Sequence, residues 1–276
     1  MTKLYDRTAK TLLTAALVVV CLLYVFPVFW FLMSSLKPGS ELFSYPLTIL
    51  PKTATLQNFV EAWSTLDFFK YFKNTFLSAT LTTAFTIFAS ATCGFAFAKY
   101  DRKWLRFFFV CIIATTMLPT EVIMNPTFTV IRVTGLYNRL AGIIIPSINT
   151  ATGIFMFRSF FLSVPDSLIE CARMDGASDG KIFLRIMLPL ARPIVMTLAI
   201  FSFQWRWNDY IWPLIVLNNP DKYTLQVALR SIIGAQNIDW ALLLAASVIS
   251  ILPLLLVFIV FQRYIMNAGA TSGMKD

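Results

Sequence analysis

The chain has 276 residues, of which 58% are hydrophobic and only 13% are charged, and its mean hydropathy is +0.71. Soluble globular proteins carry roughly 45–50% apolar and about 25% charged residues, so this composition excludes a soluble domain and indicates an integral membrane protein. The net charge of +9 does not point to nucleic acid as a partner, because the basic residues form short clusters between apolar runs.

Six apolar stretches are long enough to cross a bilayer as helices, since a span needs about 20 residues. The first is longer than the apolar part of a signal peptide and has no small-residue cleavage pattern, so we expect it to be retained. The predicted fold is an all-α integral membrane protein with six transmembrane helices. The predicted spans are 12–35, 71–98, 105–130, 140–161, 193–217 and 241–265.

The second span carries small residues at every fourth position. Ser90, Gly94 and Ala98 lie on one face of a helix and leave room for the backbone of another helix. This pattern predicts a close helix–helix contact, either within the chain or with a partner.

The distribution of Lys and Arg predicts which loops face the cytoplasm. With both termini inside, the cytoplasmic loops receive the tight cluster Lys99, Arg102, Lys103 and Arg106, and also the basic residues between 158 and 192. We therefore predict an N-in, C-in topology. This topology puts the connection between the fourth and fifth spans in the cytoplasm.

That connection, residues 162–189, has the local signals of two short helices joined by a turn. Ser163 can cap the first helix and Asp166 completes a capping-box pattern. Gly176 suits the left-handed residue that closes this helix, and Pro189 is expected to end the second one. A short amphipathic helix outside the bilayer fits a groove on another protein.

The same segment resembles the EAA loop of ABC-importer permeases, whose pattern is Glu-Ala-Ala, three residues, Gly, nine residues, then Ile-x-Leu-Pro. Cys171 stands where the pattern has its first Ala, and cysteine is also small and apolar in packing. In that family the loop is the coupling helix that docks in a cleft of the ATPase subunit. The resemblance assigns ATPase coupling to Glu170, Cys171, Ala172, Asp175, Gly176, Ala177, Ile186, Leu188 and Pro189.

The resemblance extends over nearly the whole chain and is most specific for the second permease subunit of maltose-type carbohydrate importers. Trp207–Tyr210 and the following Thr224–Leu225 look like the fifth-span region of that subunit. The endings 262–264 and 273–275 are similar to its tail, although the last residue departs from the family form. The resemblance implies a single permease domain over residues 1–276, with 162–189 as its coupling loop.

A permease of this family works only as part of a complex. The resemblance implies a non-enzymatic subunit that moves a sugar or a related polar solute across the bacterial cytoplasmic (inner) membrane, which the chain crosses several times. The implied partners are a second homologous permease, two ATP-binding-cassette ATPase subunits, an extracytoplasmic solute-binding protein and membrane lipid. We expect no cofactor or metal on this chain, because ATP and Mg belong to the ATPase subunits.

Polar residues inside the predicted third and fifth spans are candidates for the solute path, because such groups usually face a cavity. Aromatic rings with amide and carboxylate neighbours would suit a carbohydrate. Alternatively, the fifth-span cluster is an interfacial aromatic belt with an Arg206–Asp209 ion pair, and the third-span residues are buried partners of other helices. The candidates are Gln204, Trp207, Asn208, Asp209, Tyr210, Glu121 and Asn125.

Other function classes fit the sequence less well. The segment Gly176–Lys181 has only three residues between its glycines and lacks the Ser or Thr of a phosphate-binding P-loop, so we expect no nucleotide site. A membrane-embedded enzyme is disfavoured because the chain contains no histidine and no paired carboxylates within its spans. A self-contained secondary transporter is disfavoured because no inverted repeat is visible.

Overall fold

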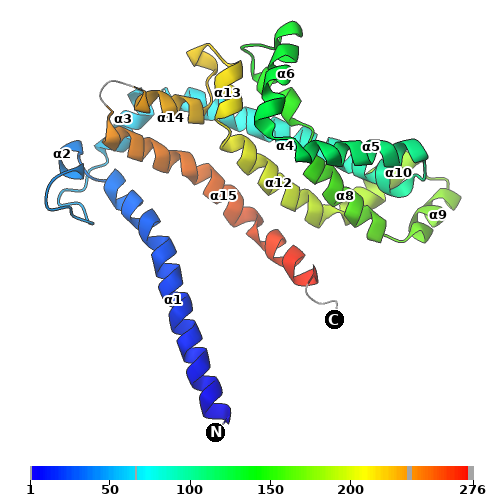
Figure 1. Ribbon diagram of the computed structural model, residues 1–276, viewed down its shortest axis with the longest axis horizontal. Coiled ribbons are helices and arrows are strands. Elements are labelled where there is room, and N and C mark those ends of the chain that lie inside the picture. The colour runs from blue at the N-terminus through cyan, green and yellow to red at the C-terminus, as the bar shows by residue number, and fades with distance from the viewer. Residues whose placement is uncertain (1, 66, 235–237, 273–276) are drawn as a thin grey trace. The chain divides into compact units, whose positions relative to one another are not determined.

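The computed structural model describes residues 2–65, 67–234 and 238–272 (Figure 1). All regular structure in these ranges is helical, with no β-strand, which confirms the predicted all-α class. By its internal contacts the chain forms two compact units. Unit 1 comprises Met1–Phe68 and Leu229–Ile251, and unit 2 comprises Phe69–Ala228 and Leu252–Asp276.

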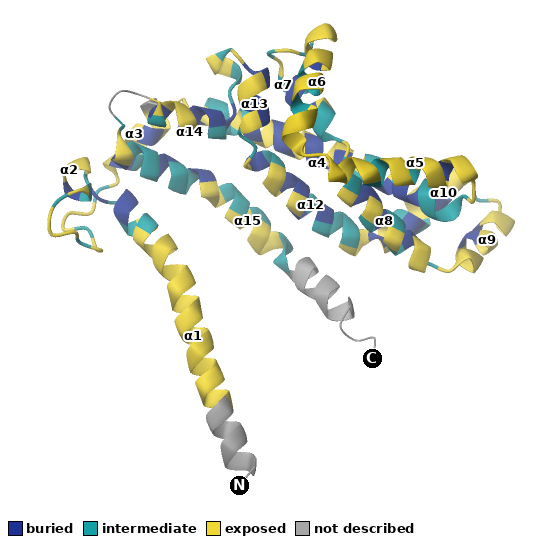
Figure 2. Ribbon diagram, viewed as in Figure 1, coloured by how far each residue is buried: buried dark blue, intermediate teal, exposed yellow. Residues whose placement is uncertain are grey.

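Unit 1 contains the first predicted span and the segment that follows it. Its helices are α1 (Thr2–Ser35), α2 (Gly39–Leu42) and α3 (Gln57–Thr65), with the end of α14 (Leu225–Ile233) and the first part of α15 (Trp240–Ser272). From Leu12 to Trp30 the large apolar side chains of α1 are exposed (Figure 2), as expected of a helix whose surroundings are lipid or another subunit.

A buried polar network orders the loop between α1 and α3. Asn58 donates to the carbonyls of Ser35 and Lys37 at 2.9 and 2.8 Å. The Glu41 carboxylate accepts from the backbone N–H of Lys52 at 2.8 Å, and this hydrogen bond is the main cause that lowers the pKa of Glu41. These hydrogen bonds give the loop a defined conformation.

Unit 2 contains the remaining helices. They are α4 (Phe68–Lys99), α5 (Lys103–Ala114), α6 (Thr120–Val133), α7 (Leu140–Ile144), α8 (Ala151–Ser163), α9 (Asp166–Met174), α10 (Asp179–Ile182), α11 (Leu188–Leu190), α12 (Arg192–Trp207), α13 (Ile211–Val216), the first part of α14 and the rest of α15. Unit 2 also contains the 3-10 helices η1 (Thr115–Met117), η2 (Ile145–Ser147) and η4 (Pro220–Lys222) and the π-helix η3 (Phe183–Met187).

Four helical segments of the described chain are long and apolar enough to cross a membrane, or up to six if each of two bent helix pairs counts as one span. The four are Lys10–Ser35, Phe68–Lys99, Leu140–Ser163 and Trp240–Gln262. The bent pairs are Lys103–Met117 with Thr120–Val133, at 112°, and Asp179–Leu190 with Arg192–Trp207, at 76°.

Three predicted spans are therefore wrong as continuous helices. The span 140–161 is interrupted between η2 and α8, where Thr150 is extended with φ −136° and ψ 118°. The span 105–130 breaks before Pro119, where the preceding Leu118 is extended with φ −87° and ψ 128°. A proline disfavours the helical conformation of the residue before it, which explains this break. The span 193–217 is interrupted after Trp207, and α13 begins only at Ile211.

Two predicted helix ends also differ. Ser163 lies in the last turn of α8, where its hydroxyl donates to the carbonyl of Phe160 at 2.7 Å, so it does not cap the next helix. Pro189 lies inside α11 near its start, a position where the missing N–H costs little. The helical path instead bends two residues later, at Ala191.

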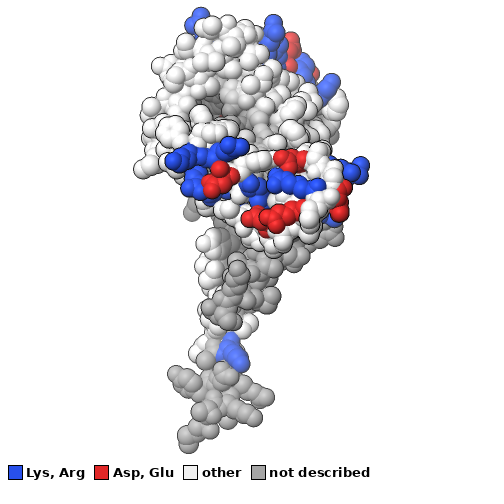
Figure 3. Space-filling model, turned by 90° about the vertical axis from the view of Figure 1, so that its right-hand side faces the viewer, with Lys and Arg blue, Asp and Glu red and all other residues white. Residues whose placement is uncertain are grey.

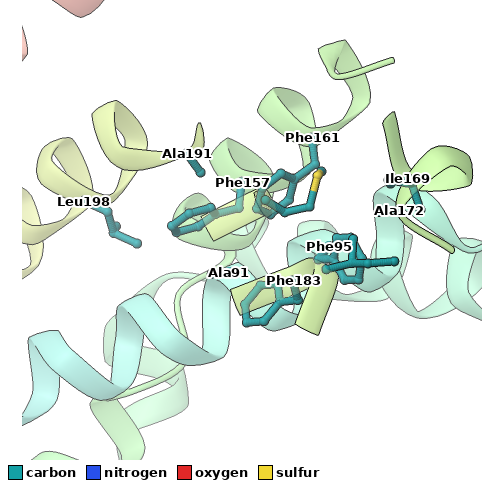
Figure 4. Close-up of a cluster of buried hydrophobic side chains, with 11 residues drawn as sticks. Ala91, Phe95, Phe157, Phe161, Ile169, Ala172, Phe183, Ala191 and Leu198 are labelled. Carbon is teal, nitrogen blue, oxygen red and sulfur yellow. The ribbon is translucent and has the colours of Figure 1, made fainter. Parts of the chain in front are cut away.

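The hydrophobic core of unit 2 connects residues 162–189, the predicted coupling loop and hereafter the coupling segment, to the long helices (Figure 4). Phe95 of α4 lies edge-on to Phe161 of α8, with ring centroids 5.9 Å apart, and near Phe183 of η3 at 5.5 Å. Ile169 of α9 and Ile182 of α10 are buried in the same cluster. Burial of these side chains anchors the short helices to α4 and α8.

Helices α4 and α8 approach each other closely at small residues. A Cβ on Gly94 would lie 2.5 Å from Cβ of Phe157 and 2.9 Å from the backbone N of Arg158. A Cβ on Gly153 would lie 2.6 Å from Oγ of Ser90. The close contact predicted from the small-residue pattern is confirmed, and its partner is a helix of the same chain.

Candidate functional site: a coupling segment and a polar cavity

The turn between α9 and α10 has the geometry that its sequence predicts. Gly176 is left-handed, with φ +78°. The N–H of Ala177 bonds to the carbonyl of Ala172, and the N–H of Gly176 to that of Arg173, both at 3.0 Å. These bonds satisfy the last carbonyls of α9, which would otherwise be unpaired.

Helix α9 has one face turned into the protein and one face left open. Ile169 and Ala172 are 4% and 9% exposed and belong to the core of unit 2. Leu168 and Met174 are 41% and 80% exposed, and Cys171 is also exposed. The open apolar face is thus formed by Leu168, Cys171 and Met174, whereas Ile169 and Ala172 face the core.

The residues to which the sequence assigned ATPase coupling also divide into a buried group and an exposed group. Ala172 is buried, and Ala177, Ile186 and Leu188 are half-buried against the core. These four hold the segment in place rather than offering a surface. The exposed ones are Glu170, Cys171, Asp175, Gly176 and Pro189.

Polar contacts tie both short helices to the end of α4. Lys99 donates to Asp166 and to the carbonyl of Val164, both at 2.6 Å. The Tyr100 hydroxyl donates to Asp179 at 2.5 Å, and Arg173 donates to the same carboxylate at 3.0 Å. The hydrogen bonds from Tyr100 and then from Arg173 lower the pKa of Asp179. Figure 3 looks onto this end of unit 2 and shows the two signs of charge side by side.

Tyr100→Phe tests the contribution of this contact. If the segment binds an ATPase subunit, as the resemblance implies, loss of one hydrogen bond to a solvent-accessible carboxylate is expected to weaken retention of that subunit about two- to fivefold, because the orientation of α10 relaxes. The measurement is the amount of ATPase that co-purifies with the chain over a salt series. Tyr137→Phe, the same change at a residue outside this segment, should have no effect, and an equal loss in both variants would contradict the assignment.

A second feature of unit 2 is a cavity of about 610 Å³ lined by residues of α4, α6, η2, α12 and α13. Hydroxyl and amide groups are numerous in its wall, and two tryptophans contribute indole rings. The lining residues are Thr86, Thr120, Ile123, Met124, Thr127, Pro146, Ser147, Asn149, Thr150, Ser202, Gln204, Trp205, Arg206, Asn208, Asp209 and Trp212.

Arg206 is held in the wall of this cavity by two contacts. Its guanidinium Nη1 donates to Oγ of Ser147 at 2.8 Å and to Oδ2 of Asp209 at 3.1 Å. The two charged side chains are 28% and 21% exposed. The ion pair anticipated from the spacing of Arg206 and Asp209 is present, and it lies in the cavity wall.

Of the seven residues predicted to form the solute path, three line this cavity: Gln204, Asn208 and Asp209. Trp207 is 1% exposed and packs on Phe72 and Phe203, so its role in this structure is packing. The remaining three, Tyr210, Glu121 and Asn125, are not among the lining residues.

Sequence reasoning missed the contribution of the segment before α8. Ser147, Asn149 and Thr150 line the cavity, although they fall inside the predicted span 140–161. The signal was available in the polar run after Pro146, which an uninterrupted lipid-facing helix would not tolerate.

The helical fold, the pair of short helices and the polar cavity are consistent with a membrane transport protein. The chain belongs to the family of binding-protein-dependent transport system inner membrane components, whose family model matches residues 90–267. It is therefore a multi-pass membrane subunit that works with a partner permease, ATPases and a binding protein, and the alternatives of an enzyme or a secondary transporter are set aside.

Individual relatives agree with this family. The chain is 35% identical to the arabinooligosaccharides transport system permease protein AraQ of Bacillus subtilis, over 95% of each chain. It is 32% identical to the diacetylchitobiose uptake system permease protein NgcG of Streptomyces coelicolor, over 97% of this chain and 89% of the relative. A solved bacterial ABC transporter that imports the acidic polysaccharide alginate matches with a TM-score of 0.85 and 26% identity, over 94% and 97% of the two chains.

Proposed function

We propose that the chain is one permease half of a carbohydrate importer in the bacterial cytoplasmic membrane. Its partners in this proposal are a second, distinct permease, two ATPase subunits that bind ATP and Mg, and an external solute-binding protein. The observation that carries the proposal is the full-length likeness to carbohydrate permeases combined with an exposed, ordered coupling segment.

The proposed topology has six spans with both termini inside and treats residues 1–276 as one permease domain. The bent pair Lys103–Met117 with Thr120–Val133 counts as one span; of the second pair, Arg192–Trp207 lies in the membrane and Asp179–Leu190 belongs to the cytoplasmic segment 162–189. Contacts at the two ends of α4 support this topology. At one end Lys99 meets Val164 and Asp166 beside the coupling segment. At the other end Lys70 pairs with Asp221 at 2.8 Å. In the proposed topology these two charges lie outside the membrane on the opposite side.

In the proposed mechanism the open face of α9 docks in a groove of the ATPase, and residues 162–189 move with it. Helix α8 connects this segment to the cavity, since it begins next to Thr150 and ends just before α9. Its 13 residues span about 20 Å as a helix. Because α8 packs tightly on α4 at Gly94, displacement of α9 is transmitted to both helices rather than absorbed by a loose contact.

The solute path in this proposal runs along the cavity, with Gln204, Asn208 and Asp209 as polar contacts for hydroxyl groups. Trp205 is 43% exposed and lines the same cavity, so its ring can stack on a sugar face. Trp207, Tyr210, Glu121 and Asn125 have no assigned contact with the solute in this conformation.

Crosslinking through Cys171 tests the coupling surface. In a chain whose other three cysteines are serine, a reagent with one thiol-reactive and one amine-reactive end should join Cys171 to an ATPase subunit in native membranes. The matched control keeps only Cys111, which is also exposed but lies in the predicted third span. Crosslinking from Cys111 instead of Cys171, or purification of the chain without any ATPase, would sink the proposal.

A further inference from the structure

The cavity of unit 2 is polar but carries no net formal charge. Among the described residues that line it, Arg206 and Asp209 are the only ionisable ones, and they pair with each other at 3.1 Å. All other polar groups in the wall are hydroxyls, amides and indole N–H groups. Such groups donate and accept hydrogen bonds without attracting either sign of charge.

The position of Arg206 determines what it can offer a solute. Ser147 and Asp209 already occupy its Nη1. An anionic solute that approached the guanidinium would also approach the Asp209 carboxylate, so attraction and repulsion would largely cancel. The anion would still lose its hydration shell on entering, and no unpaired cation of the cavity wall would offset that loss.

We infer that the Arg206–Asp209 pair makes this permease selective for uncharged, hydroxyl-rich solutes and against carboxylated or phosphorylated ones. This inference rests on the proposed function, because it takes the cavity as the solute path. Both chemistries occur among the similar proteins, since arabinooligosaccharides and diacetylchitobiose are neutral and alginate is acidic, so the residues of this chain have to decide between them. Asp209 is thus a specificity-determining residue that acts by neutralising Arg206.

A thiol in the cavity measures its charge directly. Thr127→Cys, in the complete complex with the four native cysteines of this chain replaced by serine, introduces one thiol into the cavity wall. Its modification is timed with two reagents of similar size, anionic 2-sulfonatoethyl and cationic 2-(trimethylammonio)ethyl methanethiosulfonate. We expect the ratio of the two rates to lie within about threefold of the ratio for a small free thiol.

Neutralising Asp209 and neutralising Arg206 should shift this ratio of rates in opposite directions. Asp209→Asn should favour the anionic reagent at least about tenfold, and Arg206→Gln the cationic one by a similar factor. The double variant should restore the original ratio. Asp221→Asn is the matched control, because it also removes the carboxylate that pairs with a basic residue, here Lys70, but Asp221 does not line the cavity. A tenfold preference for the anion in the parent protein would overturn the inference.

Protection of the same thiol tests the solute class. Galactobiose and digalacturonate differ at C6, where the second carries carboxylates. Galactobiose should slow the modification more than digalacturonate, and Asp209→Asn should reverse this order. Stronger protection by digalacturonate in the parent protein, or protection by neither sugar, would overturn the inference. Neither result touches the ATPase crosslink through Cys171, so failure here is distinguishable from failure of the proposed function.

Discussion

Gly176→Val is expected to leave the chain in the membrane while weakening its hold on the ATPase about five- to thirtyfold. With φ at +78°, residue 176 has a conformation that costs a β-branched residue roughly 1–2 kcal/mol. A Cβ at this position would meet nothing within 4 Å, so the effect comes from backbone strain and not from a clash. Relief of that strain moves α9 relative to α10 and disturbs the docking surface.

The measurement is the amount of ATPase retained by the purified chain, together with ATP-driven solute uptake in proteoliposomes. Gly176→Asn should be much milder, because asparagine tolerates the left-handed conformation. Gly135→Val is the matched control: its φ is +72° and its Cβ would also meet nothing within 4 Å, but it lies between α6 and α7. Normal ATPase retention in Gly176→Val, or an equal loss in Gly135→Val, would contradict the coupling role.

Local signals in the sequence were sufficient to predict the turn between α9 and α10. Gly176 closes α9 because few residues other than glycine accept its backbone conformation, and this requirement is visible without any tertiary contact. The same holds for the small residues of α4, whose spacing alone predicted a close helix contact. The sequence alone did not predict which helix packs against α4 or which face of α9 is buried, because both depend on the tertiary fold.

Proline positions illustrate where the prediction of spans failed. Pro27, Pro126 and Pro253 lie inside continuous helices, whereas Pro119 stands at a bend of 112° between two helices. In the sequence all four interrupt apolar stretches in the same way. Because the local pattern is the same at all four, the tertiary surroundings decide which proline stands at a break.

The cavity could be predicted only in part for a related reason. Gln204, Asn208 and Asp209 are close in sequence and were selected together as polar residues of one span. Ser147, which binds Arg206, is 59 residues away from it and enters the site only through the fold. Conversely, Trp207 belongs to the same polar-aromatic run as Asn208 but points into the packing between helices.

Gly94→Ala is expected to destabilise the contact between α4 and α8 strongly. The added Cβ would lie 2.5 Å from Cβ of Phe157 and 2.9 Å from the backbone N of Arg158. Because one of these contacts is with backbone, rotation of a side chain cannot relieve it, and α8 must move away from α4. Overpacking of this kind costs about 1–3 kcal/mol or more.

The comparison that isolates this effect is Gly180→Ala, the identical chemical change in another helix. A Cβ on Gly180 meets nothing within 4 Å, and alanine favours a helix over glycine by about 0.8–1.0 kcal/mol, so this variant should be neutral or slightly more stable. Thermal unfolding of the purified complex and the amount of chain in membranes measure both variants. Equal stability of the two would mean that α4 and α8 are not in close contact in the assembled importer, and α8 would then be unable to transmit motion from α9 to α4.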